Sequence, residues 1–417
     1  MKKLAAAISR VTSAMLIAGI LASCGESNDN ASSGSSSKKA SSASSVSAAT
    51  SSVPIDYTSR TAAQRESYDK YGHYGNPDLG YETMPGEREA WLWPFSRDSI
   101  WNMPIGSDAK YAETGWKFVD GYGIDEEYIW TTGDDAEDLK IYKSDMHHRW
   151  PDSTGGLANG GSLFWPKGAT ISKDLLGNTC SAILQPDGRH IVQLQPTCRD
   201  TADADYVIGF PAKPIDIYDE GSYGSHWGSA LSTLGGSIRL GELTGDGDIN
   251  HALKIDPYGK TCLYFDWETM GYTWPATTAD SAASSGGYGG TNPDVRMGSL
   301  LALDPSATVE SLGIKSPVGR KLFKALQDYG CYIVDDSACD NFNWATDIAI
   351  ISEVKKAYGI DLHGRVSTAA DTVNRQYARD MRAIVNNLKV VTNNSKKSVG
   401  GGGVPRKPLA PDLPSLK

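Results

Sequence analysis

Short segments of alternating apolar and polar residues, separated by turn-forming residues, fill most of residues 115–304 and constrain the fold more than any other feature. Segments such as LKIYKS, SIRLGEL, HALKI, CLYFDW and SLLAL have strand length and lie between clusters of Gly, Asp, Asn and Pro. The segment AILQPDGRHIVQLQ predicts a hairpin that turns at Pro186-Asp187-Gly188. The 44 Gly, 20 Tyr and 11 Trp of the chain fit a β-rich extracellular fold. We therefore expect a mainly β fold, a jelly-roll-like β-sandwich.

Helical periodicity begins after Pro317. We expect three helices packed on the sandwich, near residues 319–330, 344–358 and 369–388. In the last of these, apolar residues form a stripe at helical spacing, at Val373, Tyr377, Met381, Ile384 and Leu388. The domain prediction is an N-terminal extension at 56–90, a single β-rich globular domain at 91–397 and a Gly/Pro-rich tail at 398–417.

The N-terminal 23 residues have the features of a signal peptide, because Lys2, Lys3 and Arg10 flank a short apolar core. The LASC sequence that ends at Cys24 resembles the lipobox of bacterial lipoproteins. This resemblance implies cleavage before Cys24 and its lipidation, as in palmitate-bearing lipoproteins. The Ser-rich residues 24–55 then form a flexible tether. We expect a lipid-anchored protein of the bacterial cell envelope, at the outer membrane or cell surface.

An excess of acidic residues argues against nucleic acid as a partner. Without the predicted signal peptide, 37 basic residues face 50 acidic ones. No Cys or His spacing predicts a zinc site, and we expect no metal or other cofactor. Asp246, Asp248 and Asn250 alternate like the start of a calcium loop, but His251 occupies the position of the required glycine. An EF-hand is therefore excluded, while a looser calcium site stays open beside a solvated turn.

Residues 235–256 predict one β-hairpin that carries four ionisable side chains, which are Arg239, Glu242, His251 and Lys254. Matching the apolar residues of the two strands pairs Glu242 with His251 and Arg239 with Lys254. The first pair is either a structural ion pair or a tuned acid–base pair. The second pair brings like charges together, so an anion is expected between them. That anion is either Asp256 or a carboxylate of the substrate.

Further candidate residues lie in loops around this segment. His226 in the GSHWGSALSTLGG segment is a candidate base or sugar-binding donor, with a structural role as the alternative. The predicted substrate-binding residues are the aromatic and loop residues Trp227, Tyr258, Trp274, Asn292 and Arg296. Core packing and irregular turns are the alternative explanations for these residues.

Two resemblances extend these predictions. From about Trp93 to Pro411 the chain resembles an uncharacterised family of secreted bacterial and fungal proteins, through segments that include LSTLGGSIRLGEL and YGGTNPDVRMGSLLAL. This family brings no assigned catalytic residues. The IRLGEL segment alone is similar to the Arg-x-Glu-Leu strand of jelly-roll alginate lyases, although Gly241 is inserted between Arg239 and Glu242. The second resemblance implies a polysaccharide lyase.

We therefore expect a surface enzyme that acts on a polysaccharide or cell-wall glycan, with acidic glycans as the first candidates. In a lyase, Arg239 or Lys254 would neutralise a uronate, and His226, His251 or a nearby tyrosine would remove a proton. In a hydrolase, Glu242 would need a second carboxylate, and the candidates are Asp256, Asp266 and Glu268. The alternative is a glycan-binding or cell-wall structural lipoprotein without catalysis.

Overall fold

The computed structural model describes residues 81–117, 121–143, 157–175, 178–337, 340–362 and 372–414. The predicted signal peptide, the lipidated Cys24, the tether and most of the extension lie outside these ranges. Within them, no helix is long and apolar enough to cross a membrane.

The described residues form a mainly β fold, as the sequence predicted. The strands are β1 (Tyr111–Glu113), β2 (Tyr122–Thr131), β3 (Glu137–Lys143), β4 (Leu157–Trp165), β5 (Cys180–Leu184), β6 (His190–Cys198), β7 (Tyr206–Pro211), β8 (Ile215–Asp216), β9 (Tyr223–His226), β10 (Leu253–Asp256), β11 (Leu300–Leu303), β12 (Cys331–Ile333), β13 (Phe342–Asp347) and β14 (Leu388–Val391). Thirteen of these described strands join one mixed sheet in the order β1-β14-β11-β12-β10-β13-β2-β5-β6-β7-β3-β4, with β8 paired to β6. The predicted hairpin is confirmed as the antiparallel pair β5 and β6.

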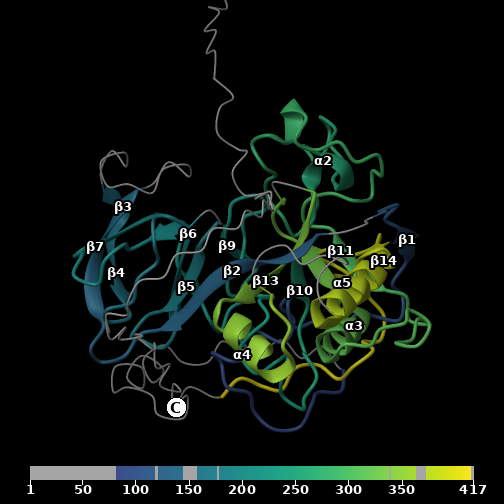
Figure 1. The fold of residues 1–417 in the computed structure, drawn as a ribbon, viewed down its shortest axis with the longest axis horizontal. Coiled ribbons are helices and arrows are strands. Elements are labelled where there is room, and N and C mark those ends of the chain that lie inside the picture. Colours follow the sequence, from purple (N-terminus) through teal and green to yellow (C-terminus); the bar gives the residue numbers. More distant parts are fainter. Residues whose placement is uncertain are drawn as a thin grey trace, which may run out of the picture. The chain divides into compact units, whose positions relative to one another are not determined.

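Alternation along the strands sends side chains into two cores on opposite faces of the sheet. In β11, Leu301 and Leu303 join a core that contains residues of helices from the C-terminal part, whereas Leu300 and Ala302 join a core with Trp91 and Trp101. A third core gathers apolar residues of strands β2 to β7. Both faces of the central strands are therefore covered, which is consistent with the predicted sandwich-like fold (Figure 1).

The α-helices contribute residues to the first of these cores (Figure 1). They are α2 (Gly259–Cys262), α3 (Pro317–Asp328), α4 (Ala349–Tyr358) and α5 (Thr372–Val385), with short 3-10 helices at Ala283–Ser285 and Val399–Gly401. The Ser316 hydroxyl caps α3 by accepting a hydrogen bond from Gly319 N. Three predicted helices are present, but the prediction for 344–347 was wrong, because these residues belong to β13. Leu388, predicted in the last helix, begins β14.

The predicted hairpin at 235–256 does not form. Residues 235–250 make turns and loops, and the strand β10 pairs with β12 on one side and β13 on the other. Both edges of β10 are thus occupied by strands that come about 80 to 90 residues later in the chain, so no edge is left for the segment around Arg239. The segment CLYFDW, also predicted as a strand, ends α2 and continues as a loop.

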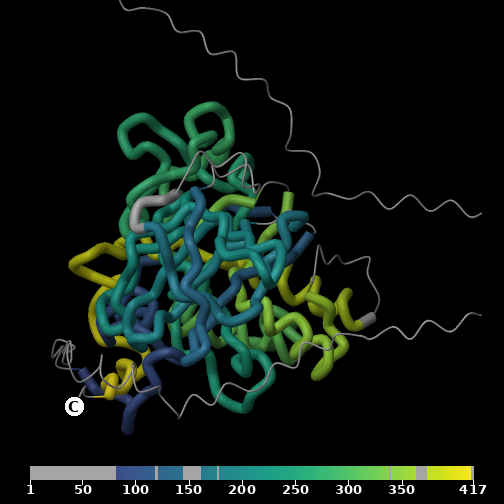
Figure 2. The backbone as a smooth tube through the Cα atoms, turned by 90° about the vertical axis from the view of Figure 1, so that its left-hand side faces the viewer, coloured from purple at the N-terminus to yellow at the C-terminus, as the bar shows by residue number. Residues whose placement is uncertain are grey.

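The C-terminal segment, predicted as a tail from residue 398, packs against the start of the domain up to residue 414. Thr83 and Leu409 form a parallel bridge, and the side chains of Leu409 and Leu413 are buried. Figure 2 shows this yellow segment beside the purple residues that begin the described chain. Glycine is required at residue 400 because two segments of the chain pass close together there. A Cβ at this position would lie 2.4 Å from Pro104 O.

Candidate carboxylate site

Polar side chains gather on the face of the sheet opposite the helices. In β10, Leu253 and Ile255 point into the helix-covered core, so Lys254 and Asp256 point to the other side. Glu127 of β2 pairs in register with Cys180, the first residue of β5. The alternation of these strands therefore places acids and a lysine inside the fold.

Lys254 and Glu127 form an ion pair with no exposed surface. Lys254 Nζ lies 2.5 Å from Glu127 Oε1, and it also donates to Ser232 O at 3.1 Å and Thr233 O at 2.6 Å. The Ser237 hydroxyl donates to the second oxygen of Glu127. Burial raises the pKa of Glu127, but the charges and hydrogen bonds of Lys254 and His226 together outweigh burial and leave that pKa below its usual value.

His226 connects this ion pair to the other acids. Its Nε2 lies 2.7 Å from Glu127 Oε1, and its Nδ1 lies 3.9 Å from Cys180 Sγ and 3.7 Å from Asp335 Oδ2. Asp335 Oδ2 is held by the amides of Asn178 at 3.1 Å and of Gln195 at 3.2 Å. Cys180 is a free, buried thiol.

Next to the buried network of Lys254, Glu127 and His226, three carboxyl groups come close together, and two of them are partly exposed. Oxygens of Asp280, Asp335 and Asp336 lie within 4.8 Å of one another, and Asp280 and Asp336 reach the surface. The Tyr288 hydroxyl donates to Asp280 Oδ2 at 2.5 Å. We refer to Asp280, Asp335, Asp336 and Tyr288 as the carboxylate site.

Two glycines let the backbone approach the carboxylate site. A Cβ on Gly228 would lie 2.8 Å from Asp335 Oδ1 and 3.1 Å from Asp280 Oδ1. A Cβ on Gly259 would lie 2.7 Å from Asp336 Oδ2. These contacts are closer than a side chain tolerates, so both positions favour glycine.

Burial and mutual repulsion favour the protonated forms of these acids. Burial, together with the charge of Asp335, raises the pKa of Asp280 to about 7. Burial and the charges of Asp280 and Asp335 raise the pKa of Asp336 to about 8. Near neutral pH the site therefore holds protonated and ionised carboxyl groups side by side, which is the arrangement that acid–base catalysis requires.

Two groups of residues in the described part of the chain have donor atoms close enough to share a metal ion. Asp280, Asp335 and Asp336 offer only oxygens, which suit a hard cation such as calcium. Asp125, Cys180 and His226 offer oxygen, sulfur and nitrogen and are all buried.

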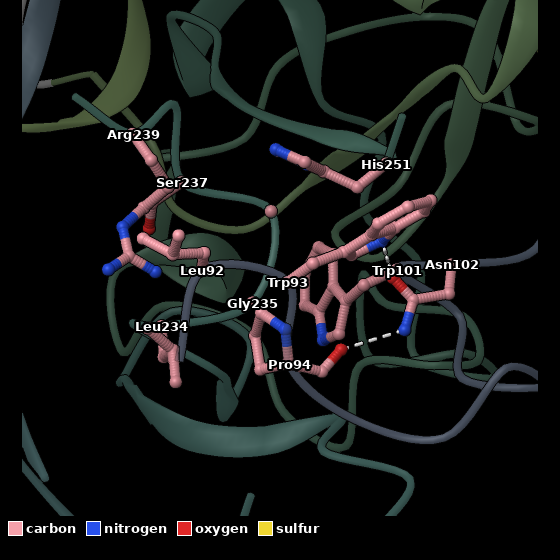
Figure 3. Close-up of a pocket in the computed structure, with 11 residues that line it drawn as sticks. Leu92, Trp93, Pro94, Trp101, Asn102, Leu234, Gly235, Ser237, Arg239 and His251 are labelled. Carbon is pink, nitrogen blue, oxygen red and sulfur yellow. Dashed lines mark hydrogen bonds between the residues drawn. The ribbon is translucent and has the colours of Figure 1, made fainter. Parts of the chain in front are cut away.

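The predicted residues of the 235–256 segment separate into two places. Arg239 and His251 line one small pocket with Trp93 and Asn102 (Figure 3), whereas Lys254 lies in the buried ion pair. The predicted pairing of Arg239 with Lys254 was therefore wrong.

The predicted contact between Glu242 and His251 is present although the hairpin is not. Glu242 Oε1 lies 3.0 Å from His251 Nε2, and His251 Nδ1 lies 2.9 Å from Ala252 O. Burial lowers the pKa of His251, but the charge of Glu242 and the hydrogen bonds to Glu242 and Ala252 together outweigh burial and leave that pKa above its usual value. Arg239 places its guanidinium 4.8 Å from the ring centre of Trp91 and donates to Trp91 O.

The predicted substrate-binding residues lie in three regions. Trp227 and Tyr258 are half-buried and directly precede Gly228 and Gly259 of the carboxylate site. Trp274 and Arg296 line a second, polar pocket. Asn292 donates to Glu113 O at 2.8 Å and so anchors a loop.

The carboxylate site itself was missed in the sequence. One usable signal was the position of Asp335 and Asp336 directly after a buried strand, at the same sheet edge where β10 ends with Asp256. Asp280 and Tyr288 carry no such signal, because they flank a short 3-10 helix in the long connection between α2 and β11.

No protein-family model, curated protein or solved structure matches the chain. The function of the carboxylate site is therefore inferred from its own geometry and chemistry.

Proposed function

We propose that this chain is a surface lipoprotein that hydrolyses a polysaccharide at the carboxylate site. The observation that carries the proposal is the convergence of Asp280, Asp335 and Asp336, with oxygens within 4.8 Å of one another and two of the residues partly exposed. Paired carboxyl groups with separated roles are the usual machinery of glycoside hydrolysis.

The three acids take different roles in this mechanism. Asp336, with a pKa raised to about 8, protonates the oxygen of the leaving sugar. Asp280 accepts the hydrogen bond from Tyr288, which favours its ionised form against burial, and with a pKa of about 7 it attacks the anomeric carbon in the ionised form. Asp335 is less exposed and adds the negative charge that favours a protonated Asp336. The short separation of the carboxyl groups favours a retaining over an inverting mechanism, because no room remains for an activated water between them.

The charge of the site favours a neutral glycan over an acidic one. Three acids within 4.8 Å would repel a uronate at the cleavage point. Trp227 and Tyr258, whose backbones border the site, are the candidates for stacking on sugar rings.

Elimination is less well supported than hydrolysis. The lyase chemistry expected from the sequence needs a cation and a base that touch the polymer. Lys254 and His226 have 0% exposed surface, and Arg239 has 6%. These side chains are buried and contact other protein groups, so they do not face a polymer in this structure.

The cellular setting is part of the proposal and comes from the sequence. The lipobox-like segment at Cys24 and the Ser-rich residues 24–55 would tether the enzyme to the cell envelope. The polymer would then be cut at the cell surface. Calcium binding by these acids is an alternative that the experiments below test.

The test is a screen of the protein against neutral and acidic polysaccharides with detection of new reducing ends. We expect turnover on a neutral polymer, and a loss of at least about 10²-fold in Asp280→Asn and in Asp336→Asn, since each removes a reacting group. Asp246→Asn is the matched control, because Asp246 is an exposed acid outside the site.

Three results would count against direct hydrolysis by these acids. Unsaturated products that absorb in the ultraviolet would indicate a lyase instead. Binding to glycans without turnover, unchanged in Asp280→Asn and Asp336→Asn, would indicate a binding lipoprotein. Activity that disappears with a chelator and returns with calcium would move these acids from catalysis to ion binding.

A further inference from the structure

The hydrogen bonds of the buried network determine which nitrogen of His226 carries a proton. The three N–H groups of Lys254 are used by Glu127, Ser232 O and Thr233 O. Lys254 therefore has no proton left for His226 Nε2, 3.2 Å away. His226 Nε2 must itself donate to Glu127 Oε1 at 2.7 Å, which leaves Nδ1 as the nitrogen with a lone pair in the neutral ring.

That free nitrogen points toward two other potential metal ligands. A ring nitrogen of His226, the thiol of Cys180 and a carboxylate oxygen of Asp125 all lie within 4.8 Å of one another. The distance from Nδ1 to Cys180 Sγ is 3.9 Å. Two such ligands on one tetrahedral zinc ion lie about 3.6 Å apart, from the usual Zn–S and Zn–N bond lengths. A shift of a few tenths of an ångström would therefore bring both atoms to one ion.

Unsatisfied carboxylate oxygens at the same place are independent evidence for a missing cation. Asp125 and Asp256 have 7% and 2% exposed surface. Asp125 Oδ2 and Asp256 Oδ1 find no hydrogen-bond partner among the described residues. A buried oxygen of an acid without a partner is costly, and natural folds satisfy such atoms with a donor or a cation.

The charges around the cluster lead to the same conclusion. Four acids, Asp125, Glu127, Asp256 and Asp335, face this buried region, and Lys254 is the one lysine or arginine among the described residues that contacts it. Burial raises the pKa of Asp125 to about 7 and the pKa of Asp256 well above its usual value, so a divalent cation would take the place of protons among these acids.

We propose that Asp125, Cys180 and His226 bind a divalent transition-metal ion of the zinc class, separate from the carboxylate site. Sulfur and imidazole ligands select such metals over calcium or magnesium. Glu127 accepts the hydrogen bond from the far nitrogen of His226, as carboxylates beside metal-bound histidines commonly do. The Cys180 thiol loses its proton to solvent when the ion binds. Full burial of the three ligands assigns the ion a structural role, with Asp256 beside it.

The test measures metal in the purified full-length protein by mass spectrometry and then replaces it with cobalt. We expect about one zinc-class ion per chain and a thiolate-to-cobalt charge-transfer band after metal removal and cobalt addition. Cys180→Ser and His226→Gln should lower the bound metal at least about tenfold, and Cys180→Ser should abolish the band. Cys331→Ser is the matched control, because Cys331 is a buried free thiol on the opposite face of the sheet.

Several outcomes would overturn the proposal. One is a folded wild-type protein that neither contains nor takes up zinc or cobalt. Another is a cobalt spectrum without a thiolate band. A third is metal content that falls in Asp280→Asn but not in Cys180→Ser, which would move the ion to the carboxylate site. Because the wild-type cobalt spectrum needs no variant, a failure of Cys180→Ser to fold still leaves a decisive measurement.

Discussion

Replacing Lys254 by methionine is the sharpest test of how the buried network stabilises this fold. Methionine keeps the length and apolar stem of the lysine but removes its charge and its three donors. Glu127 would then remain buried without its cation, and Ser232 O and Thr233 O would lose their hydrogen bonds from Nζ. The damage is therefore electrostatic rather than a loss of packing.

The expected cost follows from the burial of both partners. Lys254 and Glu127 each have 0% exposed side-chain surface. Removing one partner of a buried pair lowers the free energy of unfolding by about 3–5 kcal/mol. A domain has a total stability of about 5–15 kcal/mol, so the loss is large enough for the variant to unfold at moderate urea concentration.

The assay is urea unfolding at pH 7, followed by tryptophan fluorescence. We expect a lower midpoint for Lys254→Met with an unchanged dependence on urea. Adding Glu127→Gln removes the stranded charge, so the double variant should be more stable than the sum of the two single losses implies. The matched control is Lys173→Met, which breaks the exposed pair with Asp200 at 2.9 Å and should change little. The reasoning is refuted if Lys254→Met loses no more stability than Lys173→Met.

Three further predictions concern the site and its neighbours. Because the pKa of Asp336 is raised to about 8 in the folded state, the unfolding free energy should fall as pH rises from about 4 to about 8, and Asp336→Asn should flatten that slope in urea midpoints. Gly228→Ala should reduce polysaccharide turnover about tenfold or more, because the added methyl group would displace the carboxylates of Asp335 and Asp280. Gly247→Ala is the control, since Gly247 has open space around it. Equal turnover rates in the two variants would contradict the close approach at Gly228. Glu242→Gln should lower the pKa of His251 in an NMR titration, and an unchanged pKa would remove Glu242 as its cause.

Local sequence patterns predicted strand pairing correctly where the two paired strands are neighbours in sequence. The β5–β6 hairpin was predictable because a turn at Pro186-Asp187-Gly188 joins two alternating strands directly. The same reasoning failed for β10, since its partners β12 and β13 come from a distant part of the chain. Close packing against Trp101 requires glycine at residue 235, where a Cβ would lie 2.2 Å from Trp101 Nε1.

The ionisable residues show the same division. Glu242 and His251 were predicted as a pair and do meet, because only a short loop separates them. Lys254 was predicted beside Arg239, and instead it is buried against Glu127, which lies 127 residues away. Alternation gives the face of a side chain but does not say which segment covers that face.

The sequence by itself determined the mainly β class, the approximate helices after Pro317 and the acidic balance, because these depend on local periodicity and composition. Only the tertiary structure brought Asp280 beside Asp335 and Asp336, and placed His226 between Cys180 and Glu127. Their chemistry depends on burial and on neighbouring charges, and both arise only when distant segments of the chain pack together.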